Sequence, residues 1–81
     1  QNYPNPFNPV TTISWQLAVG RHVKLEIYNI TGQRVALLVA EKQTAGLHSV
    51  VWNASNLTSG VYLYRLQAGE YVETRKMVLM K

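Results

Sequence analysis

Residues 12–28 read TISWQLAVGRHVKLEIY, and this stretch indicates the fold more clearly than any other. Apolar residues recur at every second position in two sets, which are Ile13, Trp15, Leu17, Val23, Leu25 and Ile27. A period of two is typical of β-strands that bury one face. We therefore predict two strands joined by a turn at residues 19–21, able to pair as a hairpin. Glu26 is expected on their exposed face.

The rest of the chain continues this pattern. Further strands are predicted over residues 34–39, 48–52, 61–66 and 71–80, with a loop at 40–45 and turn residues between the others. The sequence thus predicts an all-β fold, an antiparallel β-sandwich of about six to seven strands that resembles immunoglobulin or fibronectin III domains. Trp52 is the expected core aromatic. Tyr62 is placed to send its hydroxyl back to the backbone a few residues upstream, as a corner tyrosine does.

Length and composition indicate one domain. A chain of 81 residues suits a single core, predicted here as an extended strap over residues 1–10 and a sandwich over residues 11–81. The chain has no cysteine, so packing must stabilise it. No apolar run approaches the roughly 18 residues of a membrane span, and we expect no direct membrane insertion. A start at Gln1 instead of Met suggests a piece of a longer protein.

The charge pattern argues against nucleic acid as a partner. The net charge is +4, but Arg75 and Lys76 form the only adjacent basic pair, and no basic stripe is evident in the sequence. Nucleic-acid binding requires clustered phosphate contacts. A solvated surface is the preferred interpretation.

The inventory of reactive side chains argues against an enzyme. The chain has neither Asp nor Cys, and no two of its four glutamates are predicted to converge for acid–base chemistry. His22 and His48 lack the spacing of metal ligands, and His48 is expected to be a hydrogen-bonded structural residue. We therefore predict no catalytic residue, no metal site and no cofactor. A competing hypothesis is an accessory structural or carbohydrate-binding module, with Trp15 and Tyr71 as a stacking platform.

The two ends of the chain carry its most unusual residues. Three prolines at the start fix φ and keep the chain extended, and the end is an apolar run with basic flanks. The opening residues are Tyr3, Pro4, Asn5, Pro6, Phe7, Asn8 and Pro9. The closing residues are Arg75, Lys76, Met77, Val78, Leu79, Met80 and Lys81.

These ends, together with Gly32, Gly46, Trp52, Gly60 and Tyr62 in the same order along the chain, resemble the C-terminal sorting domain of the type IX (Por) secretion system. The likeness covers essentially the whole chain. The same fold is related to the immunoglobulin-like domain of flagellar hook-capping proteins, so a purely structural module stays an alternative.

The resemblance implies a non-catalytic signal. Members of this family direct an upstream cargo domain through the periplasm and across the outer membrane of Bacteroidetes. The implied partners are the type IX translocon and a sortase-like peptidase that removes the domain, leaving the cargo secreted or attached to the cell surface. The resemblance also implies that residues 75–81 are recognised by the secretion machinery.

Overall fold

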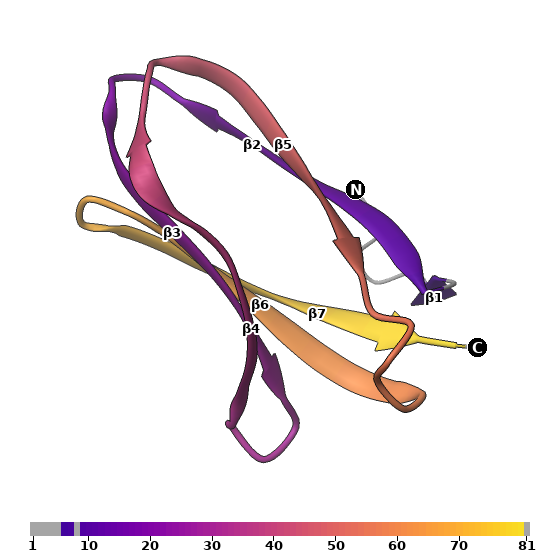
Figure 1. Ribbon diagram of the computed structural model, residues 1–81. Coiled ribbons are helices and arrows are strands. Elements are labelled where there is room, and N and C mark those ends of the chain that lie inside the picture. Colours follow the sequence, from indigo (N-terminus) through magenta and orange to yellow (C-terminus); the bar gives the residue numbers. More distant parts are fainter. Residues whose placement is uncertain (1–5, 8, 81) are drawn as a thin grey trace.

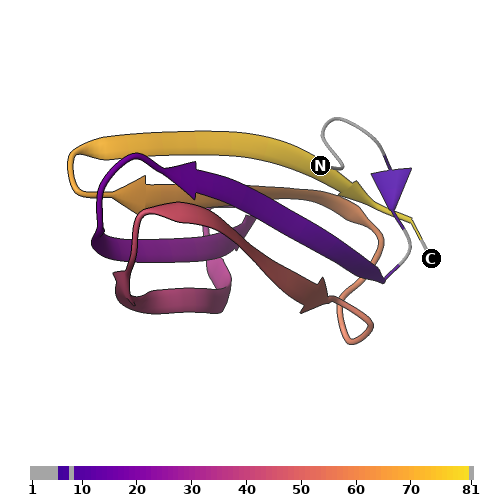
Figure 2. The same cartoon turned by 90° about the horizontal axis from the view of Figure 1, so that it is seen from above.

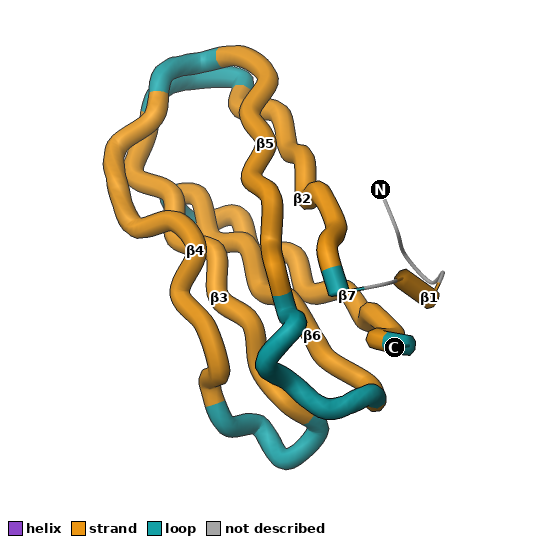
Figure 3. The backbone as a smooth tube through the Cα atoms, turned by 45° about the vertical axis from the view of Figure 1, so that its right-hand side comes forward, coloured by secondary structure: helices purple, strands orange, loops and turns teal. Residues whose placement is uncertain are grey.

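Every regular element of the structure is a β-strand. The computed structural model describes residues 6–7 and 9–80, and it contains no helix in this part of the chain. Figure 3 shows strands along almost the whole backbone, joined by short loops. In chain order they are β1 (Pro6–Phe7), β2 (Val10–Leu17), β3 (Arg21–Asn29), β4 (Arg34–Gln43), β5 (Gly46–Asn53), β6 (Gly60–Ala68) and β7 (Tyr71–Leu79). The predicted all-β class is confirmed.

The strands form two sheets that pack face to face. The large sheet has the order β1-β7-β6-β3-β4, and the small sheet consists of β2 and β5. All pairings are antiparallel except the one between β1 and β7. Figure 1 shows β2 and β5 running together in a layer separate from β3, β4, β6 and β7. This arrangement agrees with the expected immunoglobulin-like β-sandwich.

The predicted hairpin between the first two long strands is wrong. β2 pairs with β5 along its whole length, whereas β3 pairs with β4 and β6. Residues 18–20 carry the chain from one sheet to the other, and Figure 1 shows this connection beside the one between β4 and β5. Because each strand has one apolar face, placing the two strands in opposite layers buries both faces in a shared core.

The predicted loop at residues 40–45 is also mostly wrong. β4 continues to Gln43, and only Thr44 and Ala45 connect it to β5. The polar end of β4 pairs with the start of β3 at the edge of the large sheet, where solvent can reach its side chains. Gln43 is further held by Trp15, whose indole Nε1 donates to Gln43 Oε1 at 3.1 Å. Polarity indicated exposure there and not the absence of a strand.

The core lies between the two sheets and agrees with the predicted periodicity. Ile13, Trp15 and Leu17 of β2 are buried, and they face a layer in which Val23, Leu25 and Ile27 of β3 are completely buried. β6 and β7 complete it with Tyr62, Tyr64, Leu66, Ala68, Met77 and Leu79, and β5 adds Trp52. At about 25 cal/mol per Å² of apolar surface, such residues supply most of the stability of a domain without disulfides.

Two aromatic predictions are confirmed. Trp52 is buried, and its ring meets that of Tyr62 edge-on, with centroids 6.1 Å apart. The hydroxyl of Tyr62 donates to the carbonyl oxygen of Thr58 at 2.8 Å, which ties the start of β6 to the loop before it. This is the local contact of a corner tyrosine.

The turn between β3 and β4 explains Gly32, one of the glycines that carry the family resemblance. Gly32 has a φ of 87°, a left-handed conformation that favours glycine. Its amide donates to the carbonyl oxygen of Asn29, and the Asn29 side-chain oxygen accepts from the amides of Thr31 and Gln33. The turn is thus closed by one asparagine.

Candidate functional site

The closing segment is divided between the core and the surface. β7 pairs with β6, so that Lys76 lies opposite Leu63 and Met77 lies opposite Tyr62. Met77 and Leu79 are buried, whereas Lys76 is exposed on the other face of the sheet and Met80 is 54% exposed. Lys81 lies outside the described residues. Lys76 and Met80 are therefore accessible from outside, while Met77 and Leu79 hold the strand in place.

The opening segment lies beside the closing one. Backbone pairing joins Pro6 to Val78 and Phe7 to Leu79 in parallel, and Figure 2 shows β1 next to the end of β7. The carbonyl oxygen of Pro9 then accepts a hydrogen bond from the amide of Ala54, the residue after β5. The predictions for Tyr3, Pro4, Asn5 and Asn8 fall on residues that the structure does not describe. The sequence indicates that both ends are unusual, but no pattern in it predicts that they pair.

The remaining motif residues have structural positions. Gly32 closes the turn between β3 and β4, and Gly46 and Gly60 begin β5 and β6. Trp52 and Tyr62 are in the core. These five residues shape the sandwich and do not gather at one place on its surface.

The prediction for Glu26 is wrong. It was expected on an exposed face, but it is only 4% exposed, although it does point away from the core between the sheets. Arg34 Nη1 on β4 lies 3.1 Å from Glu26 Oε2, Lys24 Nζ lies 3.7 Å from the same oxygen, and Arg65 Nη1 on β6 lies 3.6 Å from Oε1. The long cationic side chains cover the carboxylate, because β3 lies between β4 and β6. Alternation alone could not reveal this cover.

The surroundings of Glu26 lower its pKa. Desolvation by burial acts to raise the pKa of this carboxyl, but hydrogen bonds from Arg34 and Tyr28 outweigh it, helped by the positive charges of Lys24 and Arg34. Glu26 is therefore a charged group held by cations and not a proton donor at neutral pH.

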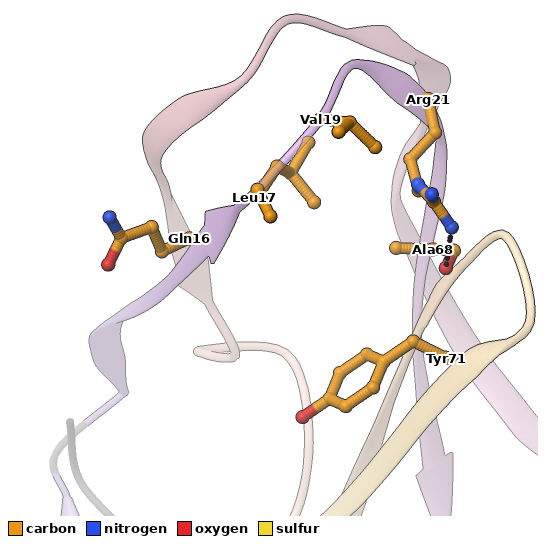
Figure 4. A pocket seen from close by; sticks show the side chains of 7 residues that line it. Gln16, Leu17, Val19, Arg21, Ala68 and Tyr71 are labelled. Atoms are coloured by element: carbon orange, nitrogen blue, oxygen red, sulfur yellow. Dashed lines mark hydrogen bonds between the residues drawn. The ribbon is translucent and has the colours of Figure 1, made fainter.

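A pocket lies at one end of the sandwich, lined by residues from the end of β2, the start of β3, the end of β6 and the start of β7. It has a volume of about 310 Å³ and is open to solvent. Figure 4 shows Arg21 directed at the carbonyl of Ala68, a hydrogen bond of 3.3 Å, with the ring of Tyr71 below them. The residues that line the pocket are Gln16, Leu17, Ala18, Val19, Arg21, Ala68 and Tyr71.

The suggested sugar platform is not formed. Tyr71 is 57% exposed, but Trp15 is buried at 7% exposure and stacks on His48 with ring centroids 6.1 Å apart. His48 Nε2 in turn bonds the carbonyl of Thr44 at 2.8 Å, as expected of a structural histidine. Without Trp15, no aromatic pair is available there for stacking on a sugar ring.

Metal chemistry finds no support in the described residues. Across residues 6–7 and 9–80, no three side chains of His, Cys, Asp or Glu are grouped so that they could hold a metal ion. The same part of the chain has no helix long and apolar enough to cross a membrane.

Comparison with models of protein families identifies a family for this chain. A family model described as the secretion system C-terminal sorting domain matches residues 1–80. No curated protein matches the chain. The match spans both the proline-rich opening and the closing strand. The structure joins these two segments through the pairing of Pro6 and Phe7 with β7.

Proposed function

This chain belongs to the family of secretion system C-terminal sorting domains, and from that premise we propose that the secretion machinery recognises residues 75–81. A domain of this family is a C-terminal sorting signal for type IX secretion. The family is non-catalytic. Membership implies an upstream cargo and type IX machinery in general, and it implies that the cargo is exported to the cell surface or secreted. The match over residues 1–80 is the single observation that carries this function.

The geometry of β7 supports the finer proposal. Its outer side chains, such as Lys76, are accessible while its inner ones anchor it, so a partner can read the strand without unfolding it. Among the residues that the structure describes, only the two of β1 pair with β7 on the side of the strand away from β6. Most of its length is therefore an edge that a partner strand could extend.

The proposal also covers the fate of the cargo. A sortase-like peptidase would cut upstream of the sandwich, and the cargo would then be released or attached to the cell surface. The pairing of Pro6 and Phe7 with the end of β7 supports this, because it holds the entry to the sandwich next to the proposed recognition segment. The translocon and the peptidase would meet the same end of the domain.

The experiment must separate recognition from folding. Deleting residues 75–81 would remove Met77 and Leu79 from the core, so a loss of export could simply report an unfolded domain. We propose instead a reporter fused to residues 1–81 that carries Lys76→Gln and Met80→Gln, two changes at exposed side chains. Thr12→Gln, on the exposed side of β2, is the matched control.

We expect the double variant to retain its melting temperature and to leave most of the reporter inside the cells of a type IX-competent host. The control variant should be exported as well as the unmodified fusion. Normal export of the folded double variant would overturn the assignment of residues 75–81 and would leave the sorting function in place.

A further inference from the structure

The fold gathers basic residues that are scattered in the sequence. Inward-facing residues alternate along β3, β6 and β7, so Lys24, Arg65 and Lys76 all project from the outer face of the large sheet. The registers place Arg34 opposite Tyr28 and Lys42 opposite His22, which brings both β4 residues to the same face. We call these five cations, Lys24, Arg34, Lys42, Arg65 and Lys76, the cationic face. Basic residues that form no stripe in the sequence therefore lie on one face of the folded domain.

The cationic face accounts for the whole net charge of the chain. Glu26 is the single carboxylate among its five cations, a balance equal to the +4 of the sequence. The other three cations of the sequence equal the other three glutamates in number. The net charge is therefore concentrated on one face and is not distributed evenly over the surface.

The opposite side of the sandwich is neutral. β2 and β5 contain no Lys, Arg, Asp or Glu, and their outward residues are small or uncharged, such as Ser14, Ser49 and Val51. A domain with a positively charged face opposite an uncharged one meets a charged partner in one orientation.

The buried carboxylate orders the centre of the cationic face. Glu26 holds Arg34 and Arg65 through one nitrogen of each guanidinium, a group that carries five N–H donors. Their side chains stay 48% and 38% exposed, so donors remain within reach of a ligand. Arginines already held in place lose less freedom when they bind carboxylates, which they contact in a bidentate fork.

The residue types favour a protein partner over a lipid surface. Tyr28 lies opposite Arg34 on β3, the strand between those that carry Arg34 and Arg65. Tyr and Arg are enriched at the centres of protein interfaces. The secretion machinery that reads this family of domains supplies proteins for such a contact. Resting on the proposed function, we propose that the cationic face docks a carboxylate-rich protein surface of that machinery.

A first test measures binding to a defined acidic probe. Poly-L-glutamate is titrated into the 81-residue chain, with phosphatidylglycerol vesicles as a separate arm. The variant Lys24→Gln/Lys42→Gln lies outside residues 75–81, and its control is Thr12→Glu/Gln16→Glu on the neutral side, which reaches the same net charge. Melting temperatures verify that both variants fold.

We expect the cationic-face variant to bind poly-L-glutamate roughly tenfold more weakly than the unmodified chain at low salt, with a much smaller loss in the control. The difference should shrink as added salt screens exposed charges. Equal losses in both variants would mean that net charge alone matters and would overturn the proposal. Tighter binding to the vesicles than to poly-L-glutamate would overturn it in favour of a lipid surface.

A second test links the cationic face to export. In the reporter fusion, Lys24→Gln/Lys42→Gln should reduce export well below that of the control at equal stability. If the unmodified fusion is exported and this variant is exported equally well, the cationic face has no role and the sorting function stands. If the unmodified fusion is not exported in a competent host, the sorting function fails and this inference fails with it.

Discussion

Glu26 Oε2 lies 3.1 Å from Arg34 Nη1, across the pairing of β3 with β4, in a position where the carboxylate is almost completely shielded from solvent. An outward-facing strand position thus holds a buried anion, because Arg34 and Arg65 fold over it from the two neighbouring strands. The same contact stabilises the large sheet and orders the centre of the cationic face. Glu26 therefore contributes both to the stability of the sheet and to the arrangement of the cationic face.

The lowered pKa of Glu26 predicts a dependence of stability on pH. Its pKa is lower in the folded chain than in the unfolded chain, where glutamate titrates at about 4.3. Its contribution is complete above the unfolded pKa and is lost as the pH falls through the folded value. Melting temperatures measured from neutral pH downward should therefore decline below about pH 5. A melting temperature that rises on acidification would contradict this account.

Replacing Glu26 by Gln should lower the free energy of unfolding by about 1–2 kcal/mol at neutral pH, because charge-assisted hydrogen bonds to partly exposed cations are lost. Urea unfolding measures the change. Glu41→Gln, at an exposed position of β4, is the control and should have little effect. The acid-induced decline should also be smaller in Glu26→Gln, which separates this carboxyl from the other three.

Trp52→Ala should lower the free energy of unfolding by about 3–5 kcal/mol, since it leaves a large cavity against Tyr62. In a domain of this size that corresponds to a fall in melting temperature of about 10 °C or more. Calorimetry gives the value directly. A shift of about 1–2 °C would show that the ring is not in the core.

Tyr62→Phe isolates the corner hydrogen bond. Removal of the hydroxyl leaves the Thr58 carbonyl without this donor and should cost about 1 kcal/mol, while the ring keeps its place in the core. Tyr71→Phe is the matched control, because its hydroxyl makes an exposed contact of 3.3 Å with Glu73. Equal losses in the two variants would argue against a special role for the corner.

The core could be predicted from the sequence because burial follows alternation. Trp15, Val23 and Leu25 were expected to face inward on period two alone, and they are buried. The predicted positions of Trp52 and Tyr62 also hold, since burying a large aromatic ring on the apolar face of its strand contributes much to the core.

Strand pairing could not be predicted in the same way. The same alternation fits β2 and β3 as a hairpin or as opposite layers, and only packing of the complete chain decides between them. The burial of Glu26 and the gathering of basic residues likewise depend on strands far apart in sequence. β4 and β6 must both lie beside β3 before Arg34 and Arg65 can meet one carboxylate.

The central claim is that the chain is a sorting signal for type IX secretion, and the most direct measurement is the fraction of a reporter found on the cell surface or in the medium when residues 1–81 are fused to its C-terminus. The account predicts that the reporter leaves the periplasm of a host with a working type IX system and stays there in the same host without that system. Export that is equal in the two hosts, or absent from both, would contradict it.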